Sequence, residues 1–135
     1  MADIAVPTSS VTRLLHKAAI KLSQHALKTR RNGFPAIARA EFFLAFRVER
    51  DLAASLSATA DPAAAVVQRS AAILAFHAGA TKEAVKLADA SLKNWMPEEV
   101  AMTLREIIRR GELAEGAGAT DAFLGAQPSQ KIVAC

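Results

Sequence analysis

A run of small side chains around one glycine, AFHAGATKEAVKLADASL (residues 75–92), constrains most strongly what this chain can fold into. Alanines stand where a helix normally carries leucines, and charged residues fall between them. Two antiparallel helices joined at Gly79 can approach closely only if the side chains that face each other are small. We therefore expect Ala72 to face Ala84 and Ala88, and a bulky residue at position 84 to destabilise the contact by about 1–3 kcal/mol.

The rest of the chain is also rich in helix formers. It has 31 alanines but only five prolines and six glycines, and alanine has the highest helix propensity. The composition and the apolar spacing predict an all-α fold of antiparallel helical hairpins in a single domain over residues 1–110. The five expected helices cover residues 9–31, 35–57, 62–78, 81–94 and 97–110. Residues 111–135 read as a flexible tail, with Cys135 as a spectator thiol.

Capping and breaking residues support these boundaries. Ser9 or Ser10 is expected to cap the first helix, and Gly33 to end it in the left-handed conformation. The other expected signals are caps by Asp61 and Thr81 for the third and fourth helices and a stop at Gly111 for the fifth.

The second helix contains the FFLAF run (residues 42–46), which widens its apolar stripe until it covers most of the helix. This pattern predicts that the second helix is the central one. Glu49 and its charged neighbours are expected to mark its solvated side.

Charge is concentrated at the start of the chain. Residues 1–40 hold seven basic residues against Asp3 alone, a formal charge of +6. Such a segment is typical of nucleic-acid or anionic-lipid binding, and an acid-poor amphipathic start also suggests an organelle transit peptide. The plainer alternative is a solvated basic helix face.

Few residues could carry chemistry. His16, His25 and His77 have no metal-type spacing to one another or to a carboxylate, and Cys135 stands alone. Arg69 and His77 are similar to the Arg…His pair of small helical nucleases of the HEPN type, but they are further apart than in that family. We predict a non-enzyme with no metal and no cofactor. No apolar run is long enough to cross a bilayer, so a soluble, cytoplasmic protein is expected.

The segment around Gly79 resembles the tetratricopeptide repeat. Ala72, Gly79, Ala84, Ser91 and Pro97 match the small residues, turn glycine and later proline of that family. The stretch also looks like short bacterial helical-pair proteins of unknown function. Gln68 and Ala75 depart from the pattern, because bulkier residues are usual there. The resemblance implies helical hairpins stacked in a right-handed arrangement, with a compact bundle as the alternative.

A weaker second copy starts upstream. Ala26, Gly33, Ala38, Phe42 and Ala45 follow the same spacing, offset by 46 residues where about 34 is typical of the family.

The resemblance also implies a concave groove lined by the first helix of each pair. Carried over by position, the partner-binding residues are Arg69, Ile73, Phe76 and His77, and from the upstream copy Leu27, Arg30 and Arg31. Such a groove implies protein–protein interaction or scaffolding, with a preference for acidic peptides. Two alternatives stay open: nucleic-acid binding by the basic first helix, and a structural subunit of a homo-oligomer or larger complex.

Overall fold

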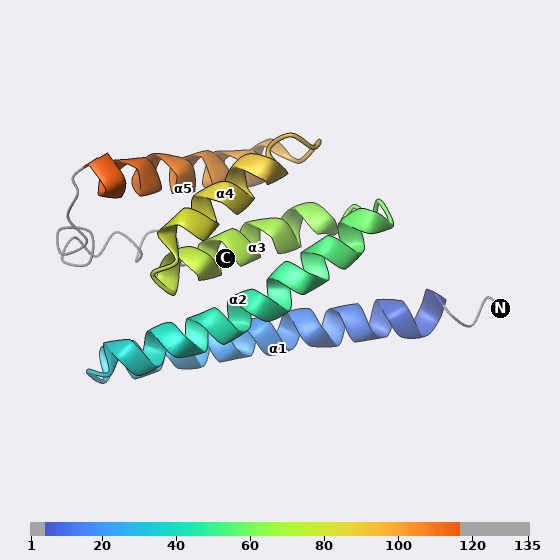
Figure 1. Cartoon of the computed structure of the whole chain (residues 1–135). Coiled ribbons are helices and arrows are strands. Elements are labelled where there is room, and N and C mark those ends of the chain that lie inside the picture. Colours follow the sequence, from blue (N-terminus) through green and yellow to red (C-terminus); the bar gives the residue numbers. More distant parts are fainter. Residues whose placement is uncertain (1–4, 117–135) are drawn as a thin grey trace.

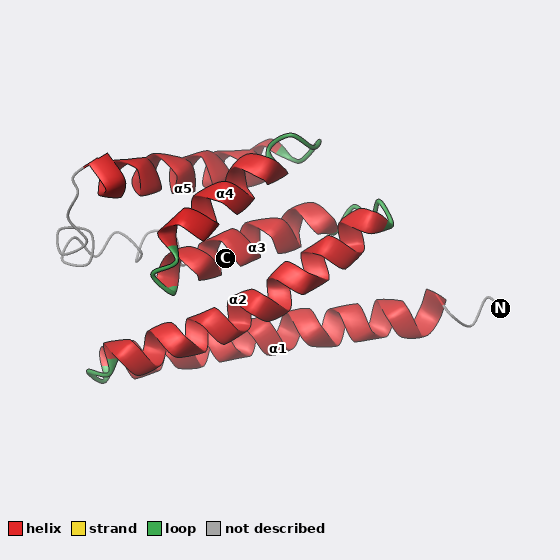
Figure 2. Cartoon of the chain, in the orientation of Figure 1, coloured by secondary structure: helices red, strands yellow, loops and turns green. Residues whose placement is uncertain are grey.

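The computed structural model describes residues 5–116, and this part of the chain is all-α, without a strand (Figure 2). The helices are α1 (Ala5–Arg31), α2 (Pro35–Ala58), α3 (Ala64–His77), α4 (Thr81–Ser91) and α5 (Glu98–Gly116). None of these helices combines the length and the apolar character that a bilayer span needs. The part of the predicted tail that follows Gly116 lies outside the described residues, and Cys135 belongs to that part.

The helices stack in chain order from α1 at the bottom of Figure 1 to α5 at the top. α2 packs on α1 and on α3, and α3 also packs on α4 and α5. Every residue from Ser70 to His77 is therefore buried. The central helix is α3, so the prediction that the second helix is central is wrong. The outer side of α2 shows why: Phe43 is 41% exposed and Leu44 is 54% exposed.

The turn between α3 and α4 is built as the small side chains predict. Gly79 has a φ of +83°, a left-handed conformation that glycine adopts without strain. Ala72, Ala84 and Ala88 have no exposed surface and belong to one core cluster. The close approach of these two helices, which the missing side-chain bulk allows, is confirmed.

Three predicted boundary signals are wrong. α1 begins at Ala5, so Ser10 lies inside the helix and does not cap it. Thr81 is the first residue of α4, which starts without a side-chain cap. α5 continues through Gly111, which was expected to stop it. The glycine is explained by packing, because a Cβ at this position would overlap the side chain of Val85.

Of the other two boundary signals, one is correct. Gly33 ends α1 with a φ of +96°, as the local sequence indicates. Asp61 does not cap α3, because the N-cap residue is Ala63 and this helix starts without a side-chain cap. Asp61 Oδ1 instead accepts a hydrogen bond from the Ala63 N–H at 2.9 Å, in the turn before α3.

Candidate functional site

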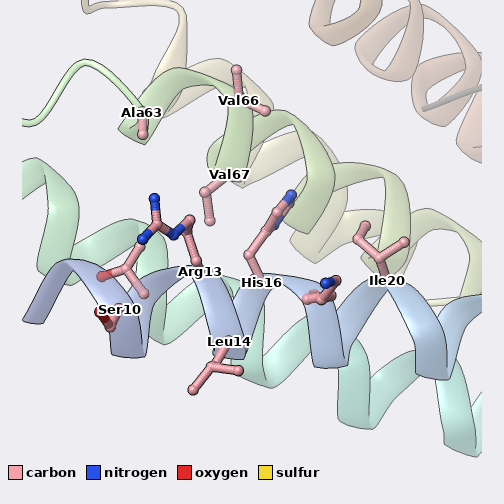
Figure 3. Close-up of a pocket in the computed structure, with 10 residues that line it drawn as sticks. Ser10, Arg13, Leu14, His16, Ile20, Ala63, Val66 and Val67 are labelled. Carbon is pink, nitrogen blue, oxygen red and sulfur yellow. The ribbon is translucent and has the colours of Figure 1, made fainter. Parts of the chain in front are cut away.

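A groove lies between the N-terminal half of α1 and the start of α3, with a volume of about 770 Å³. α1 packs chiefly on α2, and this leaves space between α1 and α3. Arg13, His16 and Ile20 point from α1 toward α3, and Val67 points from α3 toward α1 (Figure 3).

The lining combines an apolar floor with a basic rim. Ile20 and Val67 supply apolar surface, while Arg13 and Lys17 are exposed at the edge. Among the described residues, no Asp or Glu lines this groove. A site of this volume, mostly apolar with a few cationic groups, suits an amphipathic ligand that carries negative charge.

The His16 ring is held by a buried carboxylate on α2. Its Nδ1 lies 2.7 Å from Oε2 of Glu49, a carboxylate with no exposed surface. Since an ionised carboxylate only accepts, Nδ1 donates in this pair and Nε2 is left as the other polar atom of the ring. The His16 side chain keeps about a third of its surface exposed, so the ring can meet a ligand in the groove.

The environment of Glu49 is poor in polar partners. Burial raises the pKa of this carboxyl, and the Ser70 hydroxyl and His16 act in the opposite direction. Oε1 of Glu49 and Oγ of Ser70 are both buried without a well-formed hydrogen bond among the described residues. The expectation that Glu49 lies on the solvated side of its helix is therefore wrong.

A second histidine–glutamate pair joins the same two helices. His25 Nδ1 lies 2.8 Å from Oε2 of Glu41. This pair is more exposed than the first, because 64% of the His25 side chain faces solvent. Because α1 and α2 run antiparallel, histidines nine residues apart on one helix meet glutamates eight apart on the other.

Arg30 and His77, two of the predicted partner-binding residues, meet at the C-terminal end of α1. Arg30 Nη1 lies 3.4 Å from Nδ1 of His77, and the His77 ring stacks on Phe42 with centroids 4.9 Å apart. An arginine can only donate, so Nδ1 accepts and His77 is neutral. Burial first, and Arg30 second, lower the pKa of His77 to about 4.

The other predicted positions are scattered. Ile73 and Phe76 are 2% and 1% exposed, so they pack in the core and offer no surface to a partner. Leu27 is half-buried against the core, Arg69 is half-buried, and Arg31 is exposed. Partner binding by the five predicted residues other than Ile73 and Phe76 stays a prediction.

The open groove lies toward the other end of α1, and its lining residues were not among the predicted ones. A signal for them existed in the sequence: two glutamates lie in the second helix at a spacing that matches two histidines in the first. Their pairing fixes which side of α1 faces inward.

Comparison with models of protein families, with curated proteins and with solved structures gave no match. The resemblance to tetratricopeptide repeats therefore stays an expectation from the sequence. Within the described residues, no group of three or more His, Cys, Asp and Glu side chains is placed to hold a metal ion.

Proposed function

We propose that this protein is a non-catalytic binding module whose α1–α3 groove receives an acidic, amphipathic segment of another protein. The observation that carries the proposal is the groove itself, about 770 Å³ in volume, with an apolar floor and a cationic rim.

The occupant follows from charge and shape. α1 contains six basic residues and no Asp or Glu, so an acidic segment gains favourable electrostatics along its whole length. Apolar side chains of that segment would pack against Ile20 and Val67. Arg13 at the rim offers charge-assisted hydrogen bonds to the carboxylates of the bound segment. Apolar contacts inside a groove with charged contacts at its rim correspond to the helix-in-groove mode of peptide recognition.

His16 adds a directional contact. Glu49 holds the ring through Nδ1, so a ligand group in the groove would meet Nε2 with the ring already oriented. A preorganised side chain loses little conformational entropy on binding.

A selection from displayed random peptides tests the proposal. The immobilised protein should enrich peptides that combine apolar residues at helical spacing with Asp and Glu. Ala63 is exposed at the groove edge, and Ala63→Trp should fill the groove. This replacement should lower the affinity for the enriched peptides by about 10-fold or more. The matched control is Ala40→Trp, at an exposed position on α2 that does not line the groove.

Thermal unfolding of both variants checks that each remains folded. The proposal is wrong if no peptide is enriched, or if the enriched peptides bind the Ala63→Trp variant as tightly as the wild type.

A further inference from the structure

One face of α1 carries a row of basic residues that begins at the groove rim and continues beyond it. Arg13, Lys17, Lys21, Lys28 and Arg31 are separated by four, four, seven and three residues, so they lie on one helix face. All five are exposed. At 1.5 Å per residue, this basic stripe is about 27 Å long.

No carboxylate neutralises the basic stripe. None of its residues forms an ion pair within the part of the chain that the structure describes, and α1 itself contains no Asp or Glu. The two glutamates of α2 that reach α1, Glu41 and Glu49, are engaged by His25 and His16.

α5 shows the usual pattern for comparison. Arg105 pairs with Glu98, and both Arg109 and Arg110 pair with Glu106, each at 2.6 Å. The three arginines of α5 thus have carboxylate partners on their own helix. The charge of the stripe remains available to an external anion.

The charge is also concentrated. α1 alone carries a formal +6, whereas the whole chain carries +4, so the rest of the molecule is net negative. A one-sided electrostatic field of this kind attracts a polyanion to α1 and orients it there. The net negative charge of the rest of the molecule disfavours binding of the polyanion at other surfaces.

The chemistry of the stripe points to one polyanion. α1 has no Phe, Tyr or Trp, so it offers no surface on which unpaired bases would stack. α2 covers the inner side of α1, and the exposed large apolar side chains of α1 (Val11, Leu14 and Leu15) all precede Lys17, so most of the stripe has no apolar surface beside it to insert into a lipid bilayer. A straight cationic row of this length instead matches the closely spaced phosphates of a duplex.

We propose that the basic stripe of α1 binds the phosphate backbone of double-stranded nucleic acid without reading its sequence. This site is separate from the proposed peptide groove, because Lys21, Lys28 and Arg31 do not line it. Only Arg13 and Lys17 border both.

Fluorescence anisotropy with a labelled random-sequence DNA duplex of about 20 base pairs tests the proposal. Five phosphate contacts predict a slope of about −4.5 when the logarithm of the binding constant is plotted against that of the salt concentration. Lys21→Glu/Lys28→Glu should weaken binding at least about 10-fold at low salt and make the slope less steep by about two. The matched control is Lys86→Glu/Lys93→Glu, which makes the same change of net charge at exposed positions after the α3–α4 turn.

Three results would overturn the proposal. One is no binding of the duplex by the wild type at about 50 mM salt. Another is an equal loss in the two double variants, which would mean that only net charge matters. The third is tighter binding of a single strand, or of vesicles with anionic lipid, than of the duplex. The Ala63→Trp variant should bind the duplex like the wild type, so failure of the groove proposal and failure of this one are distinguishable.

Discussion

The imidazole of His16 on α1, which lines the groove, and the fully buried carboxylate of Glu49 on α2 form a 2.7 Å hydrogen-bonded pair. A carboxylate taken out of water needs a partner, and His16 is the one that the chain supplies. The pair therefore fixes how α1 is rotated on α2. That rotation decides which side chains reach the groove and which form the basic stripe.

Loss of His16 should destabilise the fold more than loss of His25. His16→Ala leaves the Glu49 charge buried without its partner, and we expect a loss of about 2 kcal/mol, below the range for fully buried pairs because His16 is partly exposed. His25→Ala is the matched control, and its loss should stay below about 1 kcal/mol because that pair is exposed. Urea unfolding at neutral pH measures both. Adding Glu49→Gln to His16→Ala should recover part of the loss, and equal losses in the two single variants would contradict this role.

His77 should make stability depend on pH under mildly acidic conditions. Its pKa is about 4 in the folded protein and about 6.5 when unfolded, so the unfolded chain takes up the proton first as the pH falls. Stability is lost between these two values, by about 3 kcal/mol, and this loss does not continue below pH 4.

Glu49 contributes in the opposite direction, because a raised pKa stabilises the fold at low pH and that contribution is lost as pH rises. The measurement is therefore the difference between wild type and His77→Gln in free energy of unfolding, followed from pH 7 to pH 4. Parallel pH profiles for the two proteins would show that His77 is not the group responsible. An NMR titration of the His77 ring should find it neutral until the pH approaches 4.

Gly111→Ala should destabilise the protein although it lies inside a helix. Helix propensity favours alanine by about 1 kcal/mol. However, the added Cβ would overlap the Val85 side chain and come within 3.3 Å of Thr81 Cγ2, and overpacking costs about 1–3 kcal/mol. Thermal unfolding should show a lower midpoint for Gly111→Ala, largely restored by Val85→Ala in the same chain. A single variant that is more stable than the wild type would mean that α4 and α5 are not in close contact here.

Ala84 tests the contact between α3 and α4. Ala84→Leu should lower the free energy of unfolding by about 1–3 kcal/mol, because the residue has no exposed surface. Ala90→Leu, at an exposed position on the same helix, should change it by less than about 0.5 kcal/mol. If both replacements are tolerated equally in chemical unfolding, the helices are not packed as closely as the small side chains indicate.

Much of the fold could be predicted from local signals. Gly33 and Gly79 end their helices with positive φ, and Pro35 begins α2 in the first turn, where its missing N–H does no harm. Each of these effects depends on residues close in sequence. The five helices were therefore predicted from the chain alone.

The rotation of α1 could not be predicted in the same way. Its sequence suggests an inward stripe that includes Val11 and Leu14, yet these side chains are 51% and 66% exposed. Apolar residues occur on more than one face of α1, so periodicity does not choose between those faces. The choice depends on Glu49, which needs His16 across the interface. That pairing shows only when the histidine spacing of α1 is compared with the glutamate spacing of α2, and not in the apolar pattern of either helix.

The most direct test of the proposed function is to map a bound peptide on the protein by NMR. A ¹⁵N-labelled sample titrated with one of the selected acidic peptides should show its largest amide shifts within residues 10–20 of α1 and residues 63–67 at the start of α3. Shifts confined to α4 and α5, or spread evenly over the molecule, would contradict the groove as the binding site.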